Sequence, residues 1–379
     1  MDRRALKALI LAMPHGADLV PLAQTLGVAV EEIIDLSANL MVGGPPEAVQ
    51  EAVEAALPRI AHYPEPLPRR LRERLAERHG VSPEQVILGA GAADLILRLA
   101  LALRQQTERE AVLLPQPNFN EYRRAFSVAG WQLDQAGSWD PALLSAWREE
   151  HAGLLLCHPN NPTGRCYEPA FIQAALERAE SLSSLLIVDQ CFLDFLPAAE
   201  ARAIDFLEAA QERGSERLVL LYSMTKFFAI PGLRLGYLVV LERELAARIQ
   251  SLCPPWPINA LAEAAGHAAL ELPEAELERQ RKRIQRLRQR QESLLLEINR
   301  EAGRELFSEI SGRANFLYFV SKIPDLELEL LLGTPPIYLR QLETVPGCPP
   351  QSFRLAIREE EVQDLLQERL RAICRSFYL

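Results

Sequence analysis

The sequence predicts an α/β protein whose main sheet is mostly parallel and covered by helices on both faces. Between about residues 85 and 240, short apolar runs alternate with stretches of helical period. The apolar runs are continuous, as in strands buried on both faces, rather than alternating with polar residues. At 379 residues with 49% apolar residues, the chain is long enough for a large core and a second lobe.

Six apolar runs are expected to be strands of this sheet: Val86–Leu88, Ala111–Leu114, Leu154–Cys157, Leu185–Val188, Leu218–Leu221 and Gly236–Val240. The connecting helices are expected at Ala92–Leu103, Asn120–Val128, Glu168–Ala179 and Ala203–Glu212. Because the carboxyl ends of parallel strands meet at one edge of a sheet, we expect the functional residues directly after these strands.

A long charged helix follows the alternating region, at Glu274–Arg304, and its apolar stripe is Leu287, Leu294, Leu295 and Ile298. It predicts a connection into a second lobe. We therefore expect residues 1–42 to be the N-terminal part of a small domain, 43–270 the large domain, and 271–379 the C-terminal part of the small domain.

The composition excludes several functional classes. With 41 basic and 51 acidic residues, the net charge of −10 argues against nucleic acid or an anionic membrane surface as the main partner. No stretch is long and apolar enough to cross a bilayer, and the short apolar run within residues 1–13 does not make a signal peptide. The cysteines lack paired spacing, which indicates reduced thiols in a cytoplasmic protein: Cys157, Cys166, Cys191, Cys253, Cys348 and Cys374.

The most informative motif is the segment 223–237, SMTKFFAIPGLRLGY. Lys226 follows an apolar strand, has hydroxyls beside it at Ser223 and Thr225, and precedes Arg234 by eight residues. A lysine near another cation loses its proton more easily and becomes a nucleophilic amine. Hydroxyls and an arginine suit a phosphate. An amine with a phosphate site is what pyridoxal phosphate requires, although a solvated surface lysine is the structural alternative.

Other polar or aromatic residues follow the remaining strands. The turn Gly89–Asp94 leads from a strand into a helix, and its backbone N–H groups can hold phosphate oxygens. Asn161 can donate its amide to a phenolate oxygen, and Phe119 offers a face for stacking on a ring. Asp189 follows three apolar residues, where a carboxylate is costly without a cation such as a protonated pyridine nitrogen. Turn formation, helix capping and core packing are the structural alternatives.

Taken in order, these motifs resemble those of the fold type I, or aminotransferase-type, pyridoxal phosphate enzymes. The matching residues are Asn-Pro-Thr-Gly at 161–164, the strand-end Asp189, Ser-x-x-Lys at 223–226 and Gly-x-Arg-x-Gly at 232–236. The resemblance covers nearly the whole chain. It implies an aminotransferase-like fold, with a mostly parallel seven-stranded sheet between helices and a smaller α/β domain from both termini.

The resemblance also implies roles for single residues. Lys226 would carry the cofactor as a Schiff base, and Asp189 would pair with the pyridine nitrogen. Asn161 would bind the ring's phenolic oxygen, and Phe119 would stack on the ring. The phosphate would be held by Gly91, Ala92, Ser223 and Arg234. Tyr63 would reach the phosphate of the cofactor in a neighbouring subunit, which implies a homodimer with shared active sites.

Within this family the chain resembles the threonine-phosphate decarboxylases of cobalamin biosynthesis, followed by the histidinol-phosphate aminotransferases. The stretches that favour the decarboxylases are residues 15–16, 35–39, 225–234 and 353–358. Phe192 also stands where the aminotransferases usually have a tyrosine. This branch implies decarboxylation of L-threonine O-3-phosphate to aminopropanol phosphate.

The substrate, a small phosphorylated amino acid, would be held by four residues. Arg354 would form a two-pronged pair with the α-carboxylate, and Arg340 would bind the substrate phosphate together with His15 and Asn39. Surface charges and a helix cap are the structural alternatives for these positions. The choice between loss of carbon dioxide and transamination depends on ångström-scale placement of the substrate, which the sequence does not display.

Three departures from the family pattern bear on the substrate. Gly-Asn-Gly-x-x-Glu is replaced by Gly-Ala-Gly-Ala-Ala-Asp at 89–94, the second asparagine of Ser-Ala-Asn-x-Asn is Met41, and Asp18 would repel a phosphate if it pointed inward. Two further functions therefore stay open: an aminotransferase of the histidinol-phosphate type, and a non-catalytic dimeric binding relative.

Overall fold

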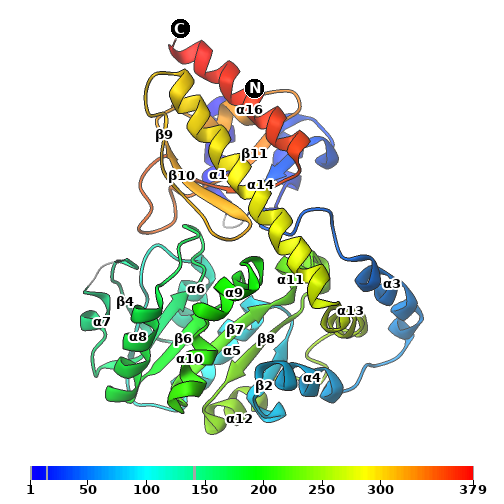
Figure 1. Cartoon of the computed structure of the whole chain (residues 1–379), viewed down its shortest axis with the longest axis vertical. Coiled ribbons are helices and arrows are strands. Elements are labelled where there is room, and N and C mark those ends of the chain that lie inside the picture. The colour runs from blue at the N-terminus through cyan, green and yellow to red at the C-terminus, as the bar shows by residue number, and fades with distance from the viewer. Residues whose placement is uncertain (1, 14–15, 140–141, 379) are drawn as a thin grey trace. The chain divides into compact units, whose positions relative to one another are not determined.

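The computed structural model of the chain describes residues 2–13, 16–139 and 142–378 (Figure 1). The chain forms two compact units, each built from separate stretches of sequence. Unit 1 contains residues 1–43, 162–165 and 282–379, and unit 2 contains residues 44–161 and 166–281. The sequence analysis placed the domain boundaries between residues 42 and 43 and between residues 270 and 271. The division into compact units does not test these boundaries, which stay a prediction.

Unit 2 contains a seven-stranded sheet in the order β2-β8-β7-β6-β5-β3-β4. The strands are β2 (Val86–Gly89), β3 (Ala111–Leu113), β4 (Gln132–Asp134), β5 (His151–Cys157), β6 (Leu185–Asp189), β7 (Leu218–Ser223) and β8 (Gly236–Val240). Strand β8 is antiparallel to both of its neighbours, and the other pairings are parallel. The predicted mostly parallel α/β fold is therefore confirmed.

Helices cover this sheet on both faces (Figure 1). The longer connections are α5 (Ala92–Arg104), α6 (Asn120–Val128), α8 (Pro169–Ser181) and α10 (Phe206–Arg213). The connections from β2 to β3 and from β3 to β4 run toward the β4 edge of the sheet. The connections from β5 to β6 and from β6 to β7 run in the opposite direction, toward the β2 edge. Because such crossovers are right-handed, α5 and α6 lie on one face, and α8 and α10 on the other. This reversal makes the carboxyl ends of β3 and β5 the expected ligand site.

The remaining helices of unit 2 are shorter or peripheral: α3 (Glu47–Ala56), α4 (Arg69–His79), α7 (Leu143–Ala146), α9 (Ala198–Ala203), α11 (Met224–Phe227), α12 (Arg243–Ser251) and α13 (Ala260–Glu271). The sequence analysis did not predict β4, because it has only three residues, Gln132–Asp134, of which two are polar and exposed. An edge strand has one paired side and needs no continuous apolar run.

Unit 1 is built around a five-stranded sheet in the order β1-β11-β12-β10-β9. The strands are β1 (Ile34–Leu36), β9 (Phe307–Ser311), β10 (Phe316–Ser321), β11 (Ile337–Gln341) and β12 (Ser352–Ala356). The helices are α1 (Arg3–Ala12), α2 (Val20–Leu26), α15 (Leu326–Leu331) and α16 (Glu360–Tyr378), with α14 (Glu274–Glu301) running in from unit 2. The expected long helix is thus present, and Leu287, Leu295 and Ile298 of its stripe are buried.

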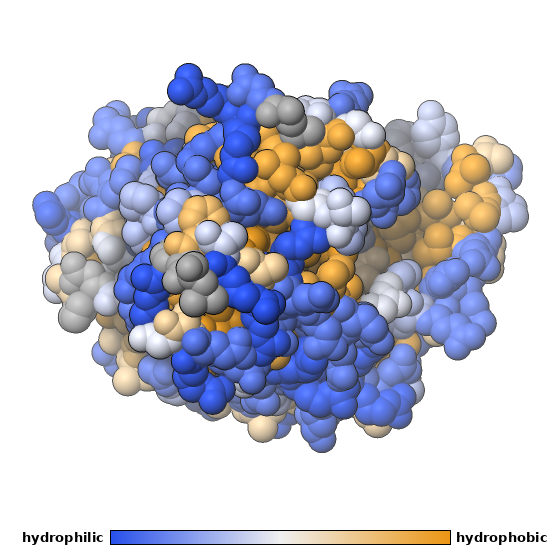
Figure 2. Space-filling view, turned by 90° about the horizontal axis from the view of Figure 1, so that it is seen from above, coloured by the Kyte–Doolittle hydropathy of each residue, from blue (hydrophilic) through white to orange (hydrophobic). Residues whose placement is uncertain are grey.

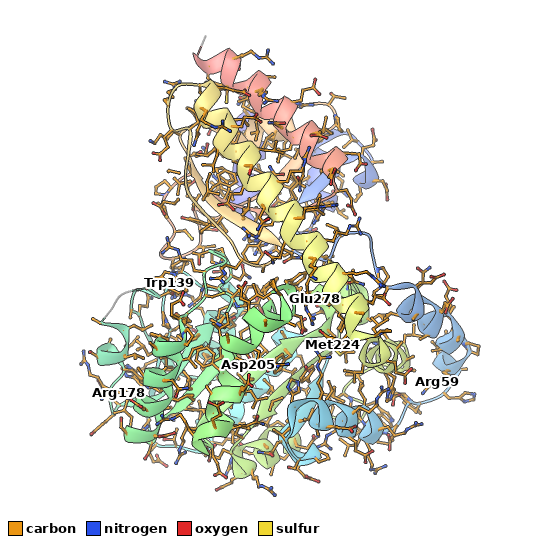
Figure 3. The ribbon with its side chains drawn as sticks, viewed as in Figure 1. Arg59, Trp139, Arg178, Asp205, Met224 and Glu278 are labelled. Carbon is orange, nitrogen blue, oxygen red and sulfur yellow. The ribbon has the colours of Figure 1, made fainter. Side chains whose placement is uncertain are left out.

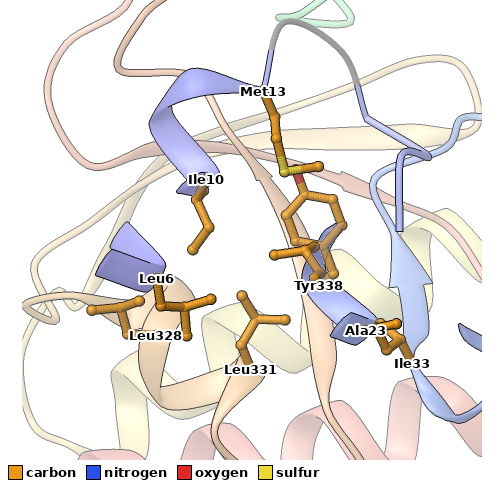
Figure 4. Close-up of a cluster of buried hydrophobic side chains, with 9 residues drawn as sticks. Leu6, Ile10, Met13, Ala23, Ile33, Leu328, Leu331 and Tyr338 are labelled. Carbon is orange, nitrogen blue, oxygen red and sulfur yellow. The ribbon is translucent and has the colours of Figure 1, made fainter. Parts of the chain in front are cut away.

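The two ends of the chain share the core of unit 1. Leu6 and Ile10 of α1 pack with Leu328 and Leu331 of α15 and with Tyr338 of β11 (Figure 4). Strand β1 pairs in parallel with β11. Burying large aliphatic side chains contributes roughly 1.5–3 kcal/mol each, so α1 is a structural part of this unit.

Surface properties agree with the composition. Polar and charged residues cover much of the face in Figure 2, with apolar side chains exposed between them. None of the helices in the described ranges is long and apolar enough to span a bilayer. Within the same ranges, no cluster of three or more histidine, cysteine, aspartate or glutamate side chains is arranged to hold a metal ion.

Candidate active site

The site in unit 2 is centred on Asp189 and Lys226, which follow neighbouring parallel strands. Asp189 is the last residue of β6 and is only 6% exposed. Lys226 lies in α11, three residues after the end of β7, and is half-buried. Burial raises the pKa of the Asp189 carboxyl, while hydrogen bonds from Cys191 and Tyr122 and the charge of Lys226 oppose that rise. The acid and the amine therefore act on each other electrostatically.

The start of α5 forms a backbone cradle of a kind that suits an anion. Gly91 has a φ of +86°, which favours glycine, and a Cβ there would lie 2.4 Å from Nη2 of Arg234. The Arg234 guanidinium is thus packed against the first residues of a 13-residue helix, whose free N–H groups attract anions. The buried hydroxyls of Ser223 and Thr225 share a hydrogen bond of 2.7 Å at the end of β7.

Asp94, one of the departures from the family pattern, stabilises this turn. Its Oδ2 accepts a hydrogen bond from the backbone N–H of Ala90 at 3.0 Å, and its Oδ1 accepts from Arg98. The carboxylate is therefore occupied with the turn and with an arginine. Aspartate is shorter than the glutamate usual at this position of the family, but it still holds the turn that leads into Ala92, the first residue of α5.

Asn161 and Phe119 follow β5 and β3, the strands on either side of the reversal in strand order. Asn161 is buried, and its backbone N–H donates to Sγ of Cys157 at 3.3 Å. Phe119 is the N-cap of α6 and is half-buried. Phe192 is buried three residues after Asp189 and has no hydroxyl to offer a ring oxygen. Asn161 and Phe119 thus follow the carboxyl ends of adjacent strands, and their expected contacts with a cofactor ring stay a prediction.

Tyr63 lies in a more exposed part of unit 2. It is 81% exposed, and its ring stacks on Trp256 with centroids 4.5 Å apart. Leu57 and Ile60 are exposed nearby in sequence, in the short 3-10 helix Leu57–Ala61. Arg59 of that helix, labelled in Figure 3, lies at the edge of unit 2. It forms an ion pair with Glu263. A tyrosine held by stacking while its edge stays in solvent is available to another molecule.

The expected substrate residues belong to unit 1. Arg340 on β11 and Arg354 on β12 are directly opposite each other in the sheet. Arg340 donates to the carbonyl of Met13 at 2.8 Å, and Arg354 donates to that of Ser37 at 2.7 Å. Burial and the charge of Arg340 lower the pKa of Arg354 to about 9. A buried arginine that faces a half-buried one with a lowered pKa favours an anionic ligand.

Asn39 also has the character of a ligand-binding residue. It is 4% exposed, and neither of its amide atoms has a hydrogen-bond partner among the residues that the structure describes. Met41 is buried, and Asp18 is exposed rather than directed into the core. His15, the remaining expected phosphate ligand, lies outside the described residues.

Tyr122 was missed by the sequence analysis. It is 1% exposed, and its hydroxyl donates to Oδ2 of Asp189 at 2.5 Å. The available signal was its position, three residues after Phe119 in the first turn of α6, where both side chains lie on one helix face. A tyrosine on an apolar helix face is usually a core residue, so its hydrogen bond to Asp189 could be recognised only in the folded structure.

With this geometry the chain is assigned to a class. Residues 31–369 match the aminotransferase class I and II family, and the chain belongs to that family. It is 33% identical to the threonine-phosphate decarboxylase of Salmonella typhimurium over 95% of this chain and 96% of that protein. Both the family resemblance and the branch inferred from the motifs are thereby confirmed.

Solved structures agree on the fold. The L-threonine-O-3-phosphate decarboxylase of Porphyromonas gingivalis superposes with a TM-score of 0.78 at 22% identity, covering 90% of this chain and 99% of that one. The histidinol-phosphate aminotransferase of Sinorhizobium meliloti in complex with pyridoxal-5'-phosphate gives 0.79 at 21% identity, covering 97% of both chains. At these identities the likeness concerns the fold.

Proposed function

We propose that this chain is a pyridoxal phosphate enzyme that decarboxylates L-threonine O-3-phosphate to aminopropanol phosphate, a reaction of cobalamin biosynthesis. The observation that carries the cofactor assignment is the buried Asp189 carboxylate within electrostatic reach of Lys226. The assignment of the reaction is supported by the decarboxylase that is 33% identical over nearly the full length of both chains.

The residues present fit the cofactor. Asp189 supplies a buried negative charge for a protonated ring nitrogen, and Lys226 supplies the amine that binds the aldehyde. Glycine at position 91 leaves room for Arg234 beside the start of α5, and this supports a role for both residues with Ala92 and Ser223 in holding the phosphate. When bound, pyridoxal phosphate takes up the electron pair released at the substrate α-carbon.

The other ring contacts follow the family assignment. Asn161 would donate its side-chain amide to the ring oxygen, and Phe119 would cover one face of the ring. Both follow strands whose carboxyl ends flank the reversal in strand order, which supports these roles. Lys226, once released from the cofactor, is the group that would return a proton to the α-carbon after carbon dioxide leaves.

The substrate contacts are proposed on charge. Arg354 would bind the α-carboxylate, and Arg340, Asn39 and His15 would bind the substrate phosphate. Two facing arginines and a buried asparagine with unsatisfied amide atoms support a small ligand with two anionic groups. Binding of such a ligand would raise the lowered pKa of Arg354, because the negative charge of the ligand would offset the positive charge of Arg340.

An aminotransferase of the histidinol-phosphate type is the second candidate, because such an enzyme shares the fold. Phe192 favours the decarboxylase, since the aminotransferases of the family usually place a tyrosine hydroxyl there. A non-catalytic dimeric relative is disfavoured by the presence of Lys226, Asp189, Asn161 and Arg234 together.

We further propose a homodimer with shared active sites, in which Tyr63 reaches the cofactor phosphate of the partner. The exposed Tyr63 and Ile60 support this, since large apolar side chains are seldom left in solvent together. A cytoplasmic location is in keeping with six free cysteines and no disulfide among the described residues.

The deciding experiment incubates the purified chain and pyridoxal phosphate with L-threonine O-3-phosphate. Carbon dioxide and aminopropanol phosphate are expected without any keto acid. Formation of glutamate that depends on 2-oxoglutarate, without carbon dioxide, would instead identify an aminotransferase. If neither product formed and no visible cofactor band appeared, the chain would be a non-catalytic relative of these enzymes.

A further inference from the structure

The hydroxyl of Tyr122 is buried against the functional carboxylate of the site. It donates to Oδ2 of Asp189 at 2.5 Å, while Oδ1 accepts from the backbone N–H of Cys191 at 2.8 Å. Each carboxylate oxygen thus has its own donor. Hydrogen bonds to a charged acceptor are stronger than neutral ones, and they restrict the rotation of the carboxylate.

The surroundings make this hydrogen bond matter more than it would in water. Tyr122 and Asp189 border an apolar cavity whose other lining residues are Ile96, Leu99, Leu155, Ile187, Leu221 and Leu238. Aliphatic walls offer the carboxylate no alternative partner, and electrostatic interactions are strong at low dielectric. Loss of the phenol would therefore leave Oδ2 without its side-chain donor in an environment that penalises a bare charge.

Tyr122 stays a donor over the working pH range. Burial, together with the negative charge of Asp189, raises the pKa of the Tyr122 phenol well above its ordinary value of 10. The proton therefore remains on the phenol, and Tyr122 stays a hydrogen-bond donor to Asp189. This hydrogen bond acts to lower the pKa of the Asp189 carboxyl, and so it favours the ionised form that a cationic ring nitrogen would require.

The same ring touches the residue expected to stack on the cofactor. Tyr122 and Phe119 meet edge to face, with centroids 5.6 Å apart and an interplanar angle of 85°. Edge-to-face contacts between aromatic rings are favourable, and they favour one orientation of both rings. One side chain from the first turn of α6 thus contacts both the strand-end acid and the aromatic face.

From this arrangement we propose that Tyr122 is a positioning residue, whose hydroxyl keeps the Asp189 carboxylate ionised and fixed in orientation for the ring nitrogen. This inference rests on the proposed function for its ligand. It does not make Tyr122 a catalytic residue, because the contact to the cofactor is made by Asp189.

The test compares Tyr122→Phe with a matched control, Tyr167→Phe. Tyr167 is also a buried tyrosine, but its hydroxyl donates to the backbone carbonyl of Ser138 at 3.1 Å rather than to Asp189. Each apoprotein is titrated with pyridoxal phosphate, and the visible absorbance of the loaded protein is followed against pH. For Tyr122→Phe we expect a dissociation constant raised about tenfold and a displaced pH midpoint. For Tyr167→Phe both quantities should stay within about twofold of wild type.

A double-mutant cycle with Asp189→Asn separates positioning from packing. If Tyr122 acts through the charge of Asp189, Tyr122→Phe should have little further effect on cofactor affinity once that charge is absent. Equal effects in both backgrounds, or wild-type behaviour of Tyr122→Phe, would overturn the proposal.

Failure of the proposed function would look different. In that case wild-type protein would not bind pyridoxal phosphate, and the comparison would use the apoprotein alone. The pH dependence of unfolding would then report the Tyr122–Asp189 pair directly. Tyr122→Phe should raise the pKa of Asp189 further, so the total loss of stability with rising pH should be larger and extend to higher pH. An unchanged pH profile would refute the positioning role independently of any cofactor.

Discussion

Arg340 and Arg354 face each other across β11 and β12, two positively charged residues in direct register on adjacent antiparallel strands. Like charges placed opposite each other are destabilising in a sheet, and burial increases the cost. The arrangement is understandable if the pair binds an anion for part of the catalytic cycle. The repulsion between the two guanidinium groups therefore explains both the expected loss of stability and the proposed binding of an anionic substrate.

Removal of Arg340 tests whether the pair binds the substrate. Arg340→Ala is expected to raise KM for L-threonine O-3-phosphate by about 10- to 100-fold, the size of lost charged hydrogen bonds. Cofactor affinity should be almost unchanged. Arg283→Ala is the control, since Arg283 forms a surface ion pair with Glu359. If cofactor loading and substrate use fell together, the assigned phosphate pocket would be wrong.

Lys226 is one of only four lysines in the chain, which makes its proposed covalent role easy to test. Reduction of the loaded protein with borohydride and peptide mass spectrometry should place the pyridoxyl group on Lys226. Lys226→Ala should lose both the adduct and the visible band. Lys322→Ala, which removes a surface partner of Glu305, should keep both. An adduct on another lysine would refute the assignment.

Asp189 should lower the stability of the apoprotein at neutral pH. Burial raises its pKa above the ordinary value of 3.8, so the folded chain binds that proton more tightly than the unfolded chain. The stability from this group is therefore greatest at low pH and is lost as pH rises through the raised pKa.

Asp189→Asn removes that pH dependence. The free energy of unfolding of the apoprotein at pH 7 is expected to rise by about 1 kcal/mol, while the dissociation constant for the cofactor rises but stays measurable. Chemical denaturation at several pH values measures the first quantity, and absorbance titration the second. A variant less stable than wild type at every pH would contradict the expected cost of the buried charge.

Gly91→Ala should weaken anion binding through a steric clash. The new Cβ would meet the Arg234 guanidinium at 2.4 Å, whereas the control Gly130→Ala has a similar φ of +83° and no atom within 4 Å. Both variants should lose about 1–2 kcal/mol of stability from backbone strain. Cofactor affinity should fall only for Gly91→Ala. Equal affinities in the two variants would exclude this cradle as the phosphate site.

The proposed dimer is tested at Ile60, which is 68% exposed. Ile60→Asp is expected to weaken dimerisation at least about tenfold, as for a truncated apolar anchor, measured by light scattering over a dilution series. Leu296→Asp on α14 is the control for an equally drastic change at an exposed leucine. A wild-type monomer, or the same mass for both variants and wild type, would contradict the proposed interface.

The sequence by itself determined the class of fold and the positions of the main motifs. Short continuous apolar runs such as Leu185–Val188, separated by stretches of helical period, are typical of a sheet buried on both faces, so the order of strands and helices could be predicted. Asp189 and Lys226 were recognisable because a charge directly after such a strand is costly without a function. Strand β4 lacked this signal, because it has a single apolar residue between two polar ones, and it was missed.

Only the tertiary structure decided which side chains support the site. Tyr122 has the pattern of a core residue, and its donation to Asp189 depends on how α6 packs against β6. The opposition of Arg340 and Arg354 likewise depends on strand register, which shifts with every residue of slippage. Periodicity reports which face of an element is buried, whereas hydrogen bonds between elements depend on distances that arise only when the chain has folded.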